Sequence, residues 1–222
     1  MTPVDLRLYG LLDPERTGGR DLAELARAAV AGGCTLLQYR DKRAGGRVLV
    51  ERARQLKRVL DGSGVPLLVN DRPDVALAAG ADGVHLGQDD LHPGDARRVL
   101  GRGKIIGLTI KTPAQADELY RLPVDYACIG GVFATDSKDN PEPPIGLDGL
   151  GRIAFRVRLA SPGLPVGAIA GITADNAASA IGAGADGVAV ISAIFAAGNP
   201  EQRAYELRAV VDLTLASRGV MP

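Results

Sequence analysis

Eight repeats of a short apolar run followed by a segment with helical periodicity predict an α/β fold, the (β/α)8 TIM barrel, as a single domain over residues 1–222. The length supports this, because 222 residues suit one barrel and are few for two full domains. The composition also fits: 46% hydrophobic residues, 29 glycines and 4% aromatic residues favour helices packed closely on parallel strands. A doubly wound open sheet is the alternative, because periodicity alone does not show that a sheet closes.

The first half of the chain contains four of these units. The expected strands are Arg7–Leu12, Thr35–Gln38, Pro66–Val69 and Gly83–Leu86. The helices expected after them are Asp21–Ala31, Val48–Leu60, Pro73–Ala79 and a segment from about Asp95 to Leu100. Asp21 is placed to cap the first helix, and Gly32 and Gly33 are placed to end it.

The second half repeats the pattern. Its expected strands are Lys104–Leu108, Tyr126–Ile129, Val166–Ile169 and Val188–Ile191. Its expected helices are Pro113–Tyr120, Asp148–Leu159, Ala174–Ile181 and Glu201–Leu215. The sequence of residues 79–84, AGADGV, recurs at residues 183–188, near the fourth and eighth strands, as half-barrel symmetry requires. We interpret both copies as structural turns, because glycine tolerates positive φ and aspartate can bond its own turn.

Charge and cysteine content exclude several classes of function. The formal net charge is zero and no basic stripe is present, so nucleic acid is not an expected partner. The start of the chain carries Asp5 and Arg7 without a long apolar segment, which indicates neither a signal peptide nor a membrane span. Cys34 and Cys128 stand far apart in apolar runs and suggest a reducing cytoplasm rather than a disulfide framework or a zinc site.

Polar residues follow the second expected strand, at the end of a barrel strand that carries chemistry in this fold. Gln38, Arg40 and Lys42 alternate there, so they share one face while the chain stays extended. An amide and two cations on one side suit a multiply charged anion, because arginine can hold phosphate oxygens bidentately. A solvated strand exit is the alternative interpretation.

Acidic residues follow the next two strands. Asn70 and Asp71 come after the third, and Asp89 and Asp90 come after the fourth. Acids from neighbouring strand ends that face two cations fit a Mg²⁺–diphosphate site, since Mg²⁺ typically takes one or two carboxylates plus phosphate oxygens. The alternative role is helix capping, and we expect one of the two aspartates at 89 and 90 to cap the following helix.

Hydroxyl groups and further cations occur in the second half. Thr109 and Lys111 follow the fifth strand, and the hydroxyl of Thr109 is a candidate ligand or a helix cap. The longest expected loop follows the sixth strand and carries Thr135, Ser137 and Lys138, a second cluster suited to anions.

Further candidate functional residues follow the last two expected strands, and one lies inside the fourth strand. Residues 170–173 and 191–192 could offer backbone N–H groups to a phosphate, with Thr173 also a candidate N-cap. His85 lies inside the fourth strand, and we interpret it as a buried, hydrogen-bonded core residue. Tyr39 and Phe133 are either pocket or packing residues.

Together these motifs resemble the thiamine-phosphate synthase family. The resemblance runs over nearly the whole chain, from Leu36 to about Ala196. The motifs that carry it are Gln38-x-Arg40-x-Lys42, Asn70-Asp71, the run from Gly83 to Asp90, Thr135-x-Ser137-Lys138, Gly171-Ile172 and Ile191-Ser192.

The resemblance implies a transferase reaction in the cytoplasm. Thiazole phosphate, which is 4-methyl-5-(2-hydroxyethyl)thiazole phosphate, would displace pyrophosphate from 4-amino-2-methyl-5-hydroxymethylpyrimidine diphosphate and give thiamine phosphate. It implies that the pyrimidine diphosphate is held by Gln38, Arg40, Lys42, Asn70, Thr109 and Lys138. It implies Asp71 and Asp90 as ligands of Mg²⁺, the one cofactor, and Thr135, Ser137, Gly171, Ile191 and Ser192 as the thiazole-phosphate site. Arg40, Lys42 and Lys138 are the expected catalytic residues, because neutralising the leaving pyrophosphate needs cations rather than a general base.

Several positions depart from the family pattern. Thr109 stands where serine is usual, and Ala170 replaces the first of a usual Gly-Gly pair. Gly131 and Ala134 replace prolines, and the segment Asn140–Pro144 is unusual. Two alternatives therefore stay open: a thiazole tautomerase-like enzyme, which would not need the diphosphate and Mg²⁺ residues, and a non-catalytic sensor of thiamine-pathway phosphates. The expected partners are small molecules, and the sequence leaves open whether the chain forms a homo-oligomer.

Overall fold

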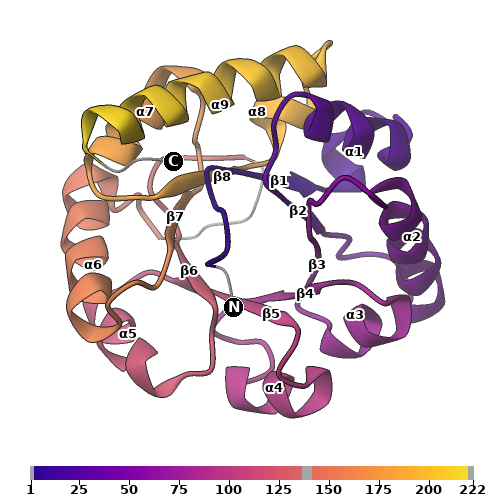
Figure 1. Cartoon of the computed structure of the whole chain (residues 1–222), viewed down its shortest axis with the longest axis horizontal. Coiled ribbons are helices and arrows are strands. Elements are labelled where there is room, and N and C mark those ends of the chain that lie inside the picture. The colour runs from indigo at the N-terminus through magenta and orange to yellow at the C-terminus, as the bar shows by residue number, and fades with distance from the viewer. Residues whose placement is uncertain (1–2, 137–141, 220–222) are drawn as a thin grey trace.

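The computed structural model describes residues 3–136 and 142–219, and its eight parallel strands close into a barrel in the order β1 to β8 (Figure 1). Because β1 pairs with both β2 and β8, the predicted barrel is confirmed over the alternative open sheet. The strands are β1 (Leu8–Leu12), β2 (Leu36–Tyr39), β3 (Leu67–Asn70), β4 (Gly83–Leu86), β5 (Ile105–Ile110), β6 (Tyr126–Ile129), β7 (Val166–Ile169) and β8 (Gly187–Val190).

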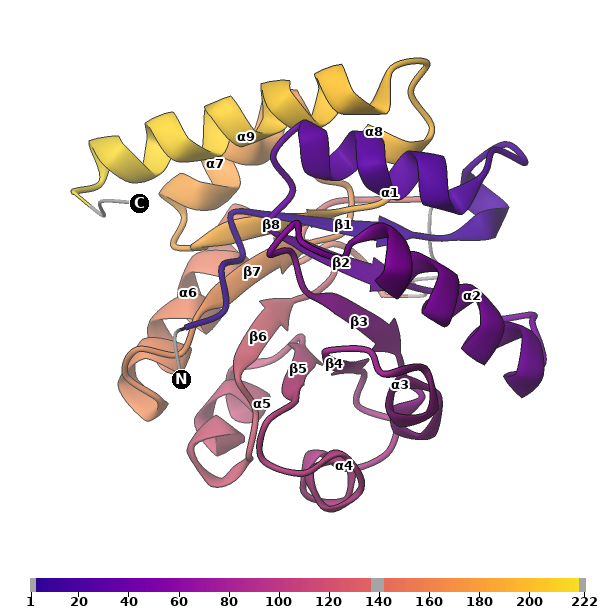
Figure 2. The same ribbon diagram turned by 45° about the vertical axis from the view of Figure 1, so that its right-hand side comes forward.

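The helices form a ring around this barrel (Figures 1 and 2). They are α1 (Leu22–Ala31), α2 (Gly46–Val59), α3 (Pro73–Ala79), α4 (Pro93–Leu100), α5 (Pro113–Glu118), α6 (Gly146–Ala160), α7 (Ala174–Gly182), α8 (Ser192–Phe195) and α9 (Pro200–Ser217). The long helix α9 lies against both α1 and α7, so the two ends of the chain pack together (Figure 2). No helix in residues 3–136 and 142–219 is long and apolar enough to cross a membrane.

Every expected strand and helix is present, with ends shifted by about two residues or fewer, as is usual for such boundaries. The sequence reasoning missed α8 and two short 3-10 helices, η1 (Pro14–Arg16) and η2 (Leu119–Arg121). Asp21 caps α1 as predicted, because its carboxylate accepts the backbone N–H groups of Ala23 and Glu24 at 2.8 and 2.9 Å.

The expectation that Asp89 or Asp90 caps α4 was wrong. His92 is the N-cap residue, and its Nδ1 accepts the backbone N–H of Gly94 at 3.1 Å. The Asp90 carboxylate instead accepts the backbone N–H of Gly87 at 2.7 Å. This bond turns the Asp90 side chain back toward the end of β4, so the residue belongs to the strand exit rather than to the helix.

Apolar side chains form two layers, one between the barrel and the helices and one inside the barrel. The inner layer includes Leu11, Leu36, Leu68, Cys128 and Ala189, all buried. These side chains close the centre of the barrel, so substrates can enter only from one of its two ends.

Three aspartates tie the strands together at the amino-terminal end of the barrel. Asp82, Asp125 and Asp186 accept the backbone N–H groups of Leu67, Ile106 and Val166, at 2.8, 2.8 and 2.9 Å respectively. The same carboxylates pair with Lys57, Arg97 and Arg158 from the surrounding helices. Asp82 and Asp186 belong to the two copies of AGADGV, so the repeat has the structural role expected of it, and Gly80 and Gly184 have the expected positive φ. The aspartates, however, bond the neighbouring strand rather than their own turn.

We expect Asp186→Ala to lower the free energy of unfolding by about 1–3 kcal/mol, because it leaves the buried N–H of Val166 without its partner. Denaturant-induced unfolding measures the change. The matched control is Asp117→Ala, which removes an exposed ion pair to Arg156 and should leave stability unchanged within error. Equal effects of the two substitutions would contradict this role for Asp186.

Candidate active site

A cavity of about 500 Å³ opens at the carboxyl ends of the strands. All eight strands, or the segments that directly follow them, contribute residues to its wall. Eight of the predicted substrate-binding residues line it, whereas Lys42 does not: Gln38, Arg40, Asn70, Thr109, Thr135, Gly171, Ile191 and Ser192. The folded chain thus brings together both halves of the predicted site, the diphosphate residues and the thiazole-phosphate residues.

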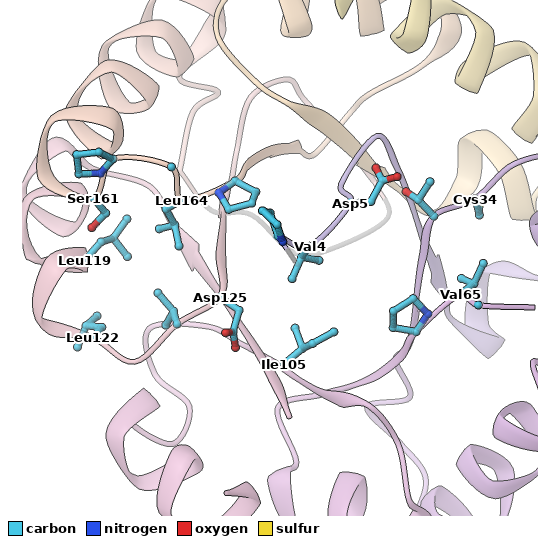
Figure 3. Close-up of a pocket in the computed structure, with 18 of the residues that line it drawn as sticks. Val4, Asp5, Cys34, Val65, Ile105, Leu119, Leu122, Asp125, Ser161 and Leu164 are labelled. Atoms are coloured by element: carbon cyan, nitrogen blue, oxygen red, sulfur yellow. The ribbon is translucent and has the colours of Figure 1, made fainter. Parts of the chain in front are cut away.

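A larger cavity of about 780 Å³ lies at the opposite, amino-terminal end. Figure 3 shows Val4, Ile105 and Leu164 around it, with Asp5 and Asp125 among the few charged groups. Both aspartates already bond to arginines, and within the described part of the chain no group of charges converges there. We therefore place the chemistry at the carboxyl end, where active sites of this fold lie.

Arg40 is held by a carboxylate that the sequence reasoning overlooked. Its guanidinium pairs with Asp13, which is only 1% exposed and also accepts the backbone N–H of Glu15 at 3.0 Å. Arg16, which follows in η1, also lines the cavity. The residues after β1 therefore position one cation and add another. The signal available in the sequence was an aspartate directly after the first expected strand, at the end of the barrel where polar residues gather.

Lys42, Asp71 and Asp90 form an ionic cluster beside Asn70, at the exits of β2, β3 and β4. Lys42 pairs with Asp71, and the carboxyl groups of Asp71 and Asp90 lie within hydrogen-bonding range of each other. Burial raises the pKa of Asp90, and the neighbouring Asp71 raises it further. The cluster therefore holds more negative charge than Lys42 alone offsets.

The backbone is shaped to hold this acidic pair. Asp71 adopts φ 61°, a left-handed conformation that aspartate tolerates better than most residues. A Cβ on Gly87 would lie 3.0 Å from a carboxylate oxygen of Asp90, so glycine leaves room for that side chain. Among the described residues no group of three or more histidine, cysteine or acidic side chains is placed to hold a metal ion. Two carboxylates nevertheless suit a Mg²⁺ ion that also binds diphosphate oxygens and water.

Below the cavity, a chain of hydrogen bonds crosses the barrel interior. Gln38 bonds to Tyr9, Tyr9 to Tyr126, Tyr126 to His85, and His85 to Thr109. His85 is thus buried and hydrogen-bonded, as predicted, but it also reaches the cavity wall. Thr109 lies within β5 rather than after it, and caps no helix, because Thr112 is the N-cap residue of α5.

Ala170 and Gly171, at the exit of β7, both have positive φ, 91° and 65°. A Cβ on Gly171 would lie 2.4 Å from the backbone oxygen of Ala134, so no larger residue fits there. The carbonyl of Ala170 accepts the backbone N–H of Phe133 at 3.1 Å, which ties the β6 and β7 exits together. Thr173 is the N-cap residue of α7, as predicted. Because a φ of 91° favours glycine, alanine at position 170 is strained in its own backbone.

The segment after β6 is anchored where it begins. Gly131 has φ 71°, which proline cannot adopt, and its carbonyl accepts the backbone N–H of Ile145 at 2.9 Å. Tyr39 and Phe133 pack in the outer apolar layer rather than on the cavity wall. Ser137, Lys138 and residues 140–141 lie outside the described residues.

Comparisons with known proteins agree with this geometry. The family profile described as thiamine monophosphate synthase matches residues 8–194. The thiamine-phosphate synthase of Agrobacterium fabrum is 50% identical over 98% of this chain and 99% of its own. That of Chloroflexus aurantiacus is 44% identical over 95% of each chain.

Two solved structures share the barrel. A thiamine phosphate pyrophosphorylase from Pyrococcus furiosus superposes with a TM-score of 0.83 and 35% identity, covering 96% of this chain and 98% of that one. Orotidine 5'-phosphate decarboxylase from Pyrococcus horikoshii has a TM-score of 0.66 and 16% identity, over 92% of this chain and 99% of its own. The second likeness concerns the fold alone.

We expect Ala170→Gly to raise the free energy of unfolding by about 1 kcal/mol, because glycine relieves the positive-φ strain at position 170. The control is Ala178→Gly, at an exposed position in α7, which should lower it by about 1 kcal/mol. Chemical denaturation distinguishes the two directions. A loss of stability in Ala170→Gly would show that this backbone is not strained.

We expect Asp90→Asn to raise the melting temperature of the metal-free protein at neutral pH. A raised pKa in the folded state means that the stability gained with protonated Asp90 is lost as pH rises through that pKa. Asparagine removes this charge, yet its side-chain oxygen can still accept the N–H of Gly87. The difference from wild type should shrink as pH falls below the ordinary aspartate pKa of 3.8. Thermal unfolding in chelator tests this, with the exposed Asp89→Asn as control; a variant less stable than wild type at neutral pH would refute it.

Proposed function

The chain belongs to the thiamine monophosphate synthase family and is a thiamine-phosphate synthase, and we propose which of its residues perform each part of that reaction. In the proposed step, the bond between the pyrimidine methylene carbon and the diphosphate oxygen breaks, and pyrophosphate leaves with the electron pair. The thiazole nitrogen then forms a bond to that carbon with its lone pair. No proton has to be removed from the nucleophile, so the site needs cations and positioning rather than a general base.

The pyrimidine diphosphate would bind on the β2–β5 side of the cavity. Gln38, Asn70 and Thr109 supply the polar groups there, and Arg40 supplies a positive charge that Asp13 holds in place. Lys42 would neutralise the diphosphate from the adjacent cluster. Lys138 is assigned on its sequence motif alone. The electron-rich aminopyrimidine would stabilise positive charge on the methylene carbon as pyrophosphate departs.

Asp71 and Asp90 would hold Mg²⁺ beside the diphosphate. When bound, the ion supplies positive charge that stabilises the departing pyrophosphate. Two oxygen-bearing side chains at adjacent strand exits, and a raised pKa for Asp90 that calls for another cation, support this assignment. Lys42 then has two partners, because it pairs with Asp71 and also faces the negative charge of the substrate.

Thiazole phosphate would bind on the β6–β8 side of the same cavity. Thr135, Gly171, Ile191 and Ser192 line that side, and Ser137 is added on its motif alone. The observation that carries the proposal is that members of both residue sets line one cavity, because two substrates must meet within bonding distance. We further propose a cytoplasmic enzyme that acts on small molecules as a single catalytic domain.

The direct test supplies purified protein with the pyrimidine diphosphate, thiazole phosphate and Mg²⁺, and omits each in turn. Pyrophosphate release that needs all three, with thiamine phosphate formed, supports the proposal. Saturable binding of thiazole phosphate without release would instead favour a tautomerase-like or sensor role, which the comparisons do not support.

We expect Asp71→Asn to reduce the rate of pyrophosphate release by at least about 100-fold, because it removes one proposed ligand of the charge-neutralising ion. Asparagine also tolerates the left-handed backbone at position 71, so the fold should persist. The control is Asp89→Asn, a neighbouring exposed aspartate that should keep wild-type activity. Near-normal activity of folded Asp71→Asn at saturating Mg²⁺ would remove Asp71 from the metal site.

A further inference from the structure

Arg16, in the short 3-10 helix η1 after β1, is a cation of the cavity wall that the sequence motifs did not indicate. The described part of the wall contains two other cations, and both are paired. Arg40 pairs with Asp13, and Lys111 pairs with Glu142. The exposed side chain of Arg16 makes no ion pair or hydrogen bond with any residue that the structure describes. Its charge is therefore available to a bound anion.

The backbone that carries Arg16 is fixed by its neighbours. The Asp13 carboxylate accepts the backbone N–H of Glu15 at 3.0 Å, and the Asp13 carbonyl accepts that of Arg16 at 2.9 Å. The buried Thr17 donates its hydroxyl to a backbone carbonyl of the same turn at 3.1 Å. The adjacent acid, Glu15, pairs with Arg43 and so does not neutralise Arg16. The turn thus holds the start of the Arg16 side chain in place and leaves its guanidinium unpaired.

A second arginine ties this turn to the exit of β8. Arg20 donates to the backbone carbonyls of Phe195 and Ala197, at the end of α8. Because β1 pairs directly with β8 in the closed barrel, the segments that follow these two strands are neighbours. Ser192, the first residue of α8, lines the same cavity as Arg16. The unpaired cation therefore lies beside one edge of the proposed thiazole-phosphate site.

The two sides of the proposed site differ in charge. On the diphosphate side, Arg40 lines the cavity and Lys42 lies beside the acidic pair, where Mg²⁺ would add positive charge. On the β6–β8 side, the assigned residues that the structure describes offer only hydroxyl and backbone groups, and Asp136 adds an acid to the wall. A phosphate monoester carries a charge of about −1.5 to −2 at neutral pH. An anion of that charge, bound next to an acid, requires a cation, and Arg16 is placed to supply it.

We propose that Arg16 binds the phosphate group of thiazole phosphate. A guanidinium can donate two parallel hydrogen bonds to phosphate oxygens, so it supplies both charge and direction. The hydroxyl and backbone groups of the β6–β8 side then orient the phosphate, while Arg16 neutralises it. The identity of this ligand rests on the proposed function, whereas the unpaired cation beside the β8 exit does not.

Steady-state kinetics of pyrophosphate release tests the contact. Arg16→Gln should raise the KM for thiazole phosphate at least about tenfold, because a hydrogen-bonded charge is lost, and should leave the KM for the pyrimidine diphosphate within about twofold. Arg16→Lys should recover part of the loss, because lysine keeps the charge but not the bidentate geometry. The matched control is Arg27→Gln, an exposed arginine of α1 outside the cavity wall, which should keep both KM values.

Two results would overturn the proposal. One is an unchanged KM for thiazole phosphate in folded Arg16→Gln. The other is a larger rise in the KM for the pyrimidine diphosphate, which would assign Arg16 to the diphosphate instead. Failure of the proposed function is distinct, because wild type would then release no pyrophosphate. Calorimetric titration of thiazole phosphate into wild type and Arg16→Gln would still test the contact in that case, and equal affinities would refute it.

Discussion

Two carboxyl groups within hydrogen-bonding range of each other repel when both are ionised, unless positive charge lies beside them. Asp71 and Asp90 are in that situation, and the protein supplies one cation, Lys42, from the neighbouring strand exit. The left-handed backbone of Asp71 and the missing side chain of Gly87 keep the pair together despite its cost. Such a pair contributes little to the stability of the fold. A divalent cation shared with a diphosphate would attract both carboxylates and so remove their repulsion when it binds.

Because the barrel is closed, the strand ends that lie around the acidic pair come from all parts of the chain. Strand exits far apart in sequence reach one cavity, which allows the proposed division between diphosphate groups from β2–β5 and groups for a second substrate from β6–β8. Directly beneath, the interior is filled by side chains rather than by solvent. The polar chain through Tyr9 and Tyr126 is the exception, and it joins side chains from five strands, β1, β2, β4, β5 and β6, beneath the cavity. At the amino-terminal end of the barrel, the carboxylates of Asp82 and Asp186 stabilise the fold by bonding neighbouring strands.

Most of the fold was predictable because each unit carries its own local pattern of apolar runs, caps and glycine turns. Asp21 and Thr173 cap their helices as local rules require, whereas Asp90 does not, because Gly87 offers its carboxylate a bond at the strand exit. The role of Asp13 was missed, since its partner Arg40 is 27 residues away. Tyr9 and Tyr126 looked like ordinary strand residues, and only barrel closure brings their hydroxyls together, 117 residues apart in sequence. A single sequence does not show which polar residues, far apart along the chain, become hydrogen-bond partners in the fold.

The assignment of Asp71 and Asp90 as Mg²⁺ ligands requires that this acidic pair and the nearby cations bind a diphosphate together with a divalent ion. Calorimetric titration of inorganic pyrophosphate into the protein, with and without Mg²⁺, tests it without requiring turnover. We expect tight binding only when Mg²⁺ is present, and we expect this gain in affinity to be lost when Asp71 and Asp90 are both replaced by asparagine. Equal affinity with and without Mg²⁺, or a Mg²⁺-dependent gain that survives the double replacement, would contradict it.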